Sequence, residues 1–441
     1  MVPYFIIASS DYIAKIILKG KKMPKKESPN NLGLTTTQSK WKNLTSSLTS
    51  DIIKKTAKEI DLNHTFPTNN FKEMGKAGLL GIPIRKDITS QASDLTSIIH
   101  VIEELAKACT STAQSYLMHI SALPMLDILA TDQQRESLLT PIIEGHHLGS
   151  FAMSEPGTGS RWWHMESYCK KTTSGHIINA SKSFVTNAGQ CQYYIVPVKT
   201  SQSASPDDLN IFYIESSTKG INVKGRQNTM GLRGTSSLPV EFNQCRVSKI
   251  HQFGNTGEGF HFLMAYVLPI YQIGLSAVYL GVAESAYQEA LHHSKTRIYS
   301  DTKKTLADSE TIQRYITEMR LKIDQTRELV YKVSKMANHV TNILNEIAPL
   351  GILNQTLTGL YNDDFLIYVG EVKIASCEMV KFVTDTTMKI CGGSAYRTGH
   401  TSERLLRDSF AGSLQGPNDD ILKTLLGKKL LGLPFPWETQ K

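Results

Sequence analysis

The sequence predicts an α+β fold of three domains: an N-terminal helical domain, a middle β-domain and a C-terminal four-helix bundle. Apolar residues recur at helical spacing over roughly residues 46–148, short β-branched and aromatic runs occupy 150–250, and long apolar stripes return from 258. A chain of 441 residues is also too long for a single hydrophobic core.

Residues 1–45 are interpreted as a leader outside the folded domains. The apolar stretch that begins at Val2 is interrupted by Asp11 and Lys15, so it is too short and too charged to span a membrane. It also lacks a signal-peptide cleavage pattern. We expect a disordered or misassigned leader, with Met23 as an alternative start, or an amphipathic surface helix.

The N-terminal helical domain is expected over 46–149. Apolar positions in the segment 44–60 recur every three to five residues, which places them on one helix face. A second helical region covers 93–129 and is interrupted near Pro124. Gly145 and Gly149 end this part of the chain.

The β-domain is expected over 150–250. Five runs rich in β-branched and aromatic residues are separated by Gly, Asn, Ser and Asp, which is typical of short strands: HIINASKSFVTN, YYIVPVKT, NIFYIES, INVKG and LPVEFNQCRV.

The segment 251–441 is expected to form a four-helix bundle. Four long stretches with apolar stripes, 260–295, 311–344, 363–390 and 418–432, supply the helices. Pro269 lies near the start of the first.

Composition narrows the function classes. An apolar content of 40% and a charged content of 20% fit a globular protein, and the net charge of +8 suits anionic small molecules. No basic run with interleaved aromatics indicates nucleic-acid binding. The six cysteines are scattered without paired spacing, which argues against a metal site or a disulfide framework and favours a reducing, cytoplasmic location.

Several motifs occur together in a fixed order. The first motif, FAMSEPGTGS (151–160), opens the β-domain, and the second, FVTNAGQ (184–190), ends one of its strands. Four more follow along the chain: MGLRGTSSLPVEF (230–242), GNTGEGF (254–260), ICGGSAY (390–396) and SERLLRDS (402–409). Glycines at 157 and 159 let the backbone approach a ligand closely. From about residue 46 to 433 the set resembles the acyl-CoA dehydrogenase family in order and spacing.

The resemblance implies FAD, bound between the β-domain and the bundle. Phe184 replaces the usual tryptophan beside the isoalloxazine, and Thr186 matches a threonine near flavin N5. Arg297 matches an arginine that reaches a neighbouring subunit's pyrophosphate, so the resemblance also implies a homodimer or homotetramer. The remaining positions implied to contact FAD are Phe151, Met153, Ser154, Gly159, Ser160, Lys389, Gly392, Gly393, Pro417 and Asp419.

The turn SLQGPNDDIL (413–422) carries the position of the family's catalytic base, where a glutamate removes the α-proton of an acyl thioester. Here that position is Gln415, whose neutral amide cannot accept the proton, and Pro417 stands in place of a threonine. Some members of the family carry the base on the first bundle helix instead, and the corresponding position here is Tyr271, a weak base near neutral pH. Asp408 is expected to pair with Arg407 or Arg404.

Three functions remain open, because a fold does not fix chemistry. The first is an FAD-dependent acyl-CoA or acyl-carrier-protein dehydrogenase with an atypical or missing base. It would bind an acyl thioester and an electron-transfer partner. The second is a two-component monooxygenase of the same fold, using FMN or reduced flavin from a flavin reductase. The third is a non-catalytic homologue that binds flavin or acyl thioester.

Overall fold

The computed structural model describes residues 33–84, 93–161, 163–347 and 363–436. Most of the predicted leader, residues 1–32, lies outside them. The first helix, α2 (Thr36–Leu48), already begins inside the segment 1–45. It starts there because Thr35 and Gln38 form a capping box, in which each side chain accepts a hydrogen bond from the other's backbone N–H.

The N-terminal domain is helical as predicted. Helices α2 and α6 pack against α5, whose first turn is capped by the Asp94 carboxylate, which accepts the Ser97 N–H. The elements are α2, η2 (Thr49–Ile53), α3 (Lys54–Asn63), α4 (Thr68–Lys76), α5 (Leu95–Ala108), α6 (Thr110–Ile120), α7 (Leu123–Leu129), α8 (Asp132–Gln134), η3 (Arg135–Leu139) and α9 (Thr140–Ile143).

The middle domain is one eight-stranded sheet of order β6-β7-β3-β2-β4-β5-β8, with β1 paired in parallel to β4. All five predicted runs form strands. The strands are β1 (Gly149–Phe151), β2 (Tyr168–Lys171), β3 (Gly175–Val185), β4 (Tyr193–Lys199), β5 (Leu209–Glu215), β6 (Ile221–Val223), β7 (Leu238–Ser248) and β8 (Gln252–Phe253), and the short helix η4 (Lys249–His251) precedes β8.

Strands β4 and β5 are buried on both faces, which explains their continuous apolar sequence. Tyr193 and Ile195 pack into the core shared with the helices, whereas Tyr194 and Val196 pack into a second core within the β-domain. Alternation along the strand sends successive side chains to opposite faces. The sheet is therefore joined to the helical domains through one face.

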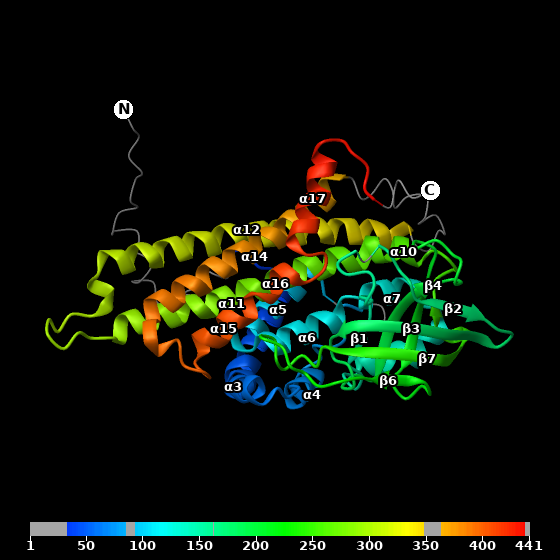
Figure 1. The fold of residues 1–441 in the computed structure, drawn as a ribbon, viewed down its shortest axis with the longest axis horizontal. Helices are drawn as coiled ribbons and strands as arrows, with labels where there is room; N and C mark the ends of the chain where they lie inside the picture. Colours follow the sequence, from blue (N-terminus) through cyan, green and yellow to red (C-terminus); the bar gives the residue numbers. More distant parts are fainter. Residues whose placement is uncertain (1–32, 85–92, 162, 348–362, 437–441) are drawn as a thin grey trace, which may run out of the picture.

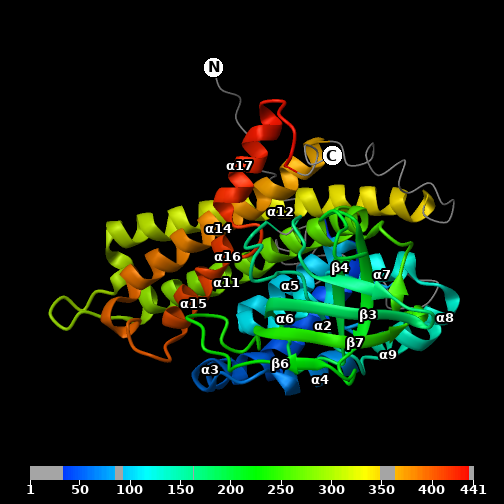
Figure 2. The same cartoon turned by 45° about the vertical axis from the view of Figure 1, so that its right-hand side comes forward.

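The C-terminal domain is a bundle of long helices. Figures 1 and 2 show α11, α12 and α14 side by side, with the β-domain against the end where α11 begins. The elements are α10 (Gly259–Phe262), η5 (Leu263–Val267), α11 (Leu268–Thr296), η6 (Leu306–Asp308), α12 (Glu310–Ile347), α14 (Asp363–Cys391), η8 (Gly392–Ser394), α15 (Thr401–Ser409), α16 (Ala411–Leu414) and α17 (Asp419–Leu430).

The continuous helical stretch Gly259–Thr296 is long and apolar enough to cross a membrane by composition, but 83% of its apolar window is buried inside the protein. It is the central core helix. Close approach requires glycine on it: a Cβ at Gly281 would lie 2.5 Å from the Glu103 carbonyl oxygen of α5.

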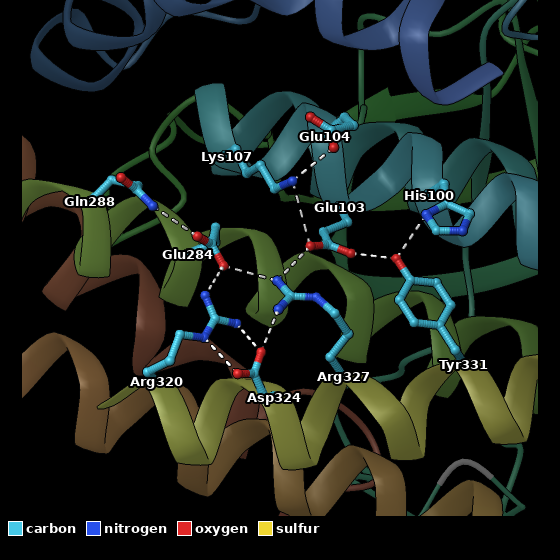
Figure 3. Close-up of polar contacts among 10 residues, drawn as sticks. All are labelled: His100, Glu103, Glu104, Lys107, Glu284, Gln288, Arg320, Asp324, Arg327 and Tyr331. Atoms are coloured by element: carbon cyan, nitrogen blue, oxygen red, sulfur yellow. Dashed lines mark hydrogen bonds and ion pairs between the residues drawn. The ribbon is translucent and has the colours of Figure 1, made fainter. Parts of the chain in front are cut away.

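A buried charge network joins α5, α11 and α12 (Figure 3). The Arg327 guanidinium lies 2.9 Å from both the Glu103 and the Glu284 carboxylates, and Tyr331 donates a hydrogen bond to Glu103. Burial acts to raise the pKa of Glu103, but Lys107 and Arg327 outweigh it and hold that pKa below its usual range. The N-terminal domain and the bundle are therefore connected by charge as well as by apolar packing.

Two buried histidines give the protein a pH-dependent stability. Burial lowers the pKa of both His100 and His119 to about 4. His119 Nε2–H donates to the Leu80 carbonyl at 3.1 Å, and its Nδ1 accepts the Gly149 N–H at 2.8 Å, so the ring is held neutral. The unfolded chain would bind these protons already near pH 6.5.

Stability should therefore be lost as the pH falls from about 6.5 to about 4, because the unfolded state takes up more protons than the folded state in that window. Denaturant unfolding at pH 7, 5.5 and 4.5 measures this. Replacing His100 by Asn should reduce the dependence of the unfolding free energy on pH, and replacing the exposed His146 by Gln should leave that dependence unchanged. A pH-independent midpoint across this window would contradict the assignment.

Candidate active site

A cavity of about 820 Å³ lies where the three domains meet. Its size is that of a small-molecule or cofactor site. It brings together nine of the residues singled out from the sequence: Phe151, Met153, Ser154, Gly159, Ser160, Phe184, Thr186, Tyr271 and Gln415.

The loop after β1 forms part of the β-domain wall. Its Glu155 is 3% exposed and lies 2.7 Å from the fully buried Lys182 ammonium. The carboxylate also accepts the backbone N–H groups of Glu166 and Ser167. Burial acts to raise the pKa of Glu155, but Lys182 and these N–H groups hold it below its usual range. Glu155 therefore shapes the loop and is not free to take a proton.

Thr186 lies on the same wall within a chain of hydroxyl groups. Thr235 donates to the Leu232 carbonyl, its hydroxyl lies 2.8 Å from that of Ser237, and the Ser237 hydroxyl lies 2.9 Å from that of Thr186. The Thr186 hydroxyl is therefore oriented at the cavity by the Ser237 hydroxyl.

Phe184 has a left-handed backbone with φ of 51° and a side chain that is 75% exposed. Both features are uncommon for a large aromatic residue. Such a conformation persists where the surroundings hold it, and here the neighbouring Ser183 N–H donates to the Ser154 carbonyl at 2.8 Å. The ring is therefore presented at the cavity rather than buried in the sheet.

The helical wall is mainly apolar. Met118 of α6 and Leu263, Val267 and Leu268 of η5 and α11 line it. Tyr271 also lines it, and burial raises its pKa above the usual range, so it cannot act as a base near neutral pH. Gln114 is 1% exposed, and neither atom of its amide has a hydrogen-bond partner among the described residues.

The turn after α16 places Gln415 on the cavity and fixes its side chain. Tyr279 of α11 donates its hydroxyl to Gln415 Oε1 at 3.0 Å. Next to it, the buried Lys373 ammonium donates to the Pro417 carbonyl at 3.1 Å and to the Asp419 carboxylate at 2.6 Å. Pro417 and Asp419 hold the turn through Lys373 and do not line the cavity of their own chain, and their contact with FAD stays a prediction.

The predicted pairing of Asp408 with Arg407 is wrong. The Asp408 carboxylate accepts the Leu232 N–H at 2.7 Å, and Arg404 acts as a nearby charge that opposes the rise of the Asp408 pKa on burial. Arg407 instead contacts Asp61 and Glu403. Asp408 is 2% exposed and the Arg407 side chain is 12% exposed, and their contacts lie at a domain junction.

Arg297, Lys389, Gly392 and Gly393 do not line the cavity. They lie at the C-terminal ends of α11 and α14, which Figures 1 and 2 place at the end of the bundle away from the β-domain. Arg297 and both glycines are exposed, and Lys389 pairs with Asp385. Within one chain these residues form a separate surface.

Four residues that shape the site were missed from the sequence: Gln114, Lys182, Tyr279 and Lys373. Lys182 and Lys373 are fully buried, whereas lysines are usually exposed. Tyr279 lies on a helix that is apolar on all sides, so its sequence context indicated only a core position. The polar Gln114 in the apolar context STAQSYLM was a signal that could have been used.

The cavity residues fit a flavin. Ser154, Ser160 and Thr186 offer hydroxyl groups on the β-domain wall, Phe184 offers a flat apolar ring, and the backbone at Gly159 is left-handed with open space where a Cβ would lie. The unpartnered Gln114 amide shows that part of the cavity's polar surface is not satisfied by the protein itself. The fold and site together define a flavoprotein with two helical domains around a sheet.

Comparisons with known proteins agree with the assignment of the chain to a flavoprotein class. Sequence models of the acyl-CoA dehydrogenase N-terminal, middle and C-terminal domains match residues 35–146, 150–245 and 273–414. An acyl-CoA dehydrogenase of Bacillus subtilis (strain 168) is 27% identical over 369 residues, which cover 83% of this chain and 90% of that protein.

Solved structures share the fold. A chain from the structure of the electron transferring flavoprotein of Acidaminococcus fermentans has a TM-score of 0.79 at 25% identity and covers 91% of this chain and 99% of its own. PigA with FAD and proline has a TM-score of 0.77 at 19% identity, covering 91% and 99%. The chain belongs to the acyl-CoA dehydrogenase superfamily; it is an oxidoreductase, and FAD is its cofactor.

Replacing Lys182 by Met should destabilise the protein by about 3–5 kcal/mol, because it leaves the buried Glu155 carboxylate without a cation. The double change Lys182→Met with Glu155→Gln should recover part of the loss. The matched control is Lys224→Met in the exposed pair with Glu241, expected to cost about 0–1 kcal/mol. Denaturant unfolding gives all three values, and equal costs for the two lysines would refute the buried pairing.

Proposed function

We propose that the protein binds an acyl thioester of CoA against FAD in this cavity and that its turn at Gln415 supplies no general base. One observation carries the proposal: the Gln415 amide lies on the cavity at the end of α16, held by the Tyr279 hydroxyl. The relatives' names supply the acyl-CoA substrate class.

No described lining residue offers a free base. Glu155 is the lining carboxylate, and it is held by Lys182 and by two backbone N–H groups. Arg407 is a cation, and Tyr271 has a raised pKa. Because dehydrogenation of an acyl thioester requires removal of a proton, the wild type should bind the thioester and oxidise it slowly.

The wall residues would hold the flavin. When bound, FAD supplies the hydride acceptor. Ser154, Ser160 and Phe184 would orient it, and Thr186 would offer its hydroxyl group, which is held by a hydrogen bond with Ser237. The buried helical wall would exclude water from the acyl chain. An electron-transfer flavoprotein is the proposed electron acceptor, as one similar structure suggests.

We propose further that FAD binding requires a second copy of the chain. Arg297, Lys389, Gly392 and Gly393 lie on the bundle end away from the cavity, where they could reach the pyrophosphate and adenosine of a neighbour's FAD. Apolar side chains exposed nearby support this: Ile298 is 55% and Tyr396 is 84% exposed.

The lack of a base at Gln415 also fits the second candidate function, a two-component flavin-dependent monooxygenase, which needs no carboxylate at that position. The two functions differ in their response to acyl-CoA. If the protein is a monooxygenase, reduced flavin should drive oxygen consumption, and acyl-CoA should leave the spectrum of the oxidised flavin unchanged.

Gln415→Glu should raise the rate of flavin bleaching by acyl-CoA under anaerobic conditions by about 10²–10⁴-fold, the usual contribution of a positioned base. One carboxylate oxygen can still accept the Tyr279 hydrogen bond. Gln415→Ala should bind acyl-CoA without this gain, and Asp420→Asn, at an exposed position outside the cavity, should behave as wild type. Fast bleaching by both wild type and Gln415→Ala would place the base elsewhere.

Arg297→Ala should weaken FAD retention during desalting and leave the far-ultraviolet circular dichroism unchanged, because the side chain is exposed and lies off its own chain's cavity. Analytical ultracentrifugation of the wild type should show a dimer or tetramer of the 49.0 kDa chain. The control is Arg314→Ala, which is exposed on α12. A monomer that retains FAD fully would disprove the shared site.

A further inference from the structure

The helical wall of the cavity contains a polar side chain that the protein leaves unsatisfied. Gln114 is 1% exposed, and both its Nε2 and its Oε1 lack a hydrogen-bond partner among the described residues. A buried amide without a partner is unfavourable and calls for an explanation, and at the wall of a cavity a ligand that completes its hydrogen bonds is one.

Gln114 belongs to the helical wall of the cavity. It lies on α6 one turn before Met118, and Leu263, Val267 and Leu268 of the neighbouring helices line the same wall. The hydroxyl groups suited to a flavin, including Ser154 and Thr186, come from the β-domain wall instead. Gln114 is therefore a polar side chain on a mainly apolar wall, and we assign that wall to the acyl chain.

The charged lining residues are already neutralised. Arg407 donates to Asp61, to Glu403 and to the Met230 carbonyl. Glu155 is paired with Lys182. No lining charge is therefore available for an ionic group on the acyl chain, and an amide, which both donates and accepts, is suited to a neutral group that does the same.

We infer that the substrate of the proposed thioester site is an acyl-CoA whose chain carries a neutral polar group, a hydroxyl or a carboxamide, that hydrogen-bonds to Gln114. This inference rests on the proposed function. A site that must hydrogen-bond its ligand disfavours an analogue without the polar group, because the buried amide is then left unpaired.

The test uses FAD-loaded protein and matched pairs of thioesters with acyl chains of four to eight carbons. In each pair a terminal hydroxyl in one member is a methyl group in the other, so that their sizes agree. Calorimetric titration gives the two dissociation constants. At one chain length the wild type should bind the hydroxyl compound about 10-fold more tightly or better. The corresponding terminal carboxylate compound should bind less tightly than the hydroxyl compound.

Gln114→Leu, of similar volume, should reverse the preference in favour of the methyl compound. Met118→Leu, one turn further along the same wall, is the matched control and should retain the preference for the hydroxyl. Thermal unfolding without ligand adds an independent reading. Gln114→Leu should raise the melting temperature, because it removes an unsatisfied buried amide.

Each other outcome is decisive. Equal hydroxyl-to-methyl ratios in wild type and Gln114→Leu would mean that water alone satisfies the amide and would overturn the inference while leaving thioester binding intact. Loss of FAD by Gln114→Leu with an unchanged ratio would assign the amide to the flavin and overturn it also. A lower melting temperature would show an internal partner. Absence of any acyl-CoA binding by wild type would overturn the proposed function itself.

Discussion

The Arg407 guanidinium is the contact on which the arrangement of the three domains around the cavity depends. Its Nη1 lies 3.0 Å from Asp61 of α3 and 2.9 Å from the Met230 carbonyl of the β-domain, and its Nη2 lies 3.0 Å from Glu403 on its own helix. A planar fork with five donors can join three domains in a way that a point charge cannot. The packing is close enough that a Cβ at Gly231 would meet the Arg407 carbonyl oxygen at 2.5 Å.

This junction lies next to the turn that carries Gln415. The Asp408 carboxylate receives the Leu232 N–H, and the turn is fixed from the other side by Lys373 through Pro417 and Asp419. The Gln415 side chain is held by the Tyr279 hydroxyl. Hydrogen bonds from buried groups on α11 and α14 therefore hold the turn against the bundle.

The fold could be predicted because the spacing of apolar residues along the chain follows the period of the helices and strands. Helical stripes and alternating strands predicted the order of the three domains, and the resemblance of the motifs to a family predicted nine of the lining residues, Ser154 and Thr186 among them. The buried ion pairs could not be predicted, because nothing in the local sequence around Lys182 and Lys373 distinguishes them from exposed lysines. Only tertiary contacts bury them. Local sequence also could not show that Pro417 and Asp419 bind Lys373, because this contact depends on a helix 44 to 46 residues away.

The spacing between the two walls of the cavity is set by Asn187, next to Thr186. Its amide Nδ2 donates to the Ser115 carbonyl of α6 and to the Gly149 carbonyl of β1, both at 3.0 Å. Asn187 is fully buried and has φ of 67°, a conformation that asparagine tolerates better than most residues. Because His119 also joins α6 to Gly149, the helix that carries Gln114 and Met118 is tied to the strand that begins the β-domain wall. The relative position of α6 and the β-domain wall is therefore determined by hydrogen bonds from the Asn187 amide to main-chain carbonyls and from the Gly149 N–H to His119, and neither Asn187 nor His119 lines the cavity.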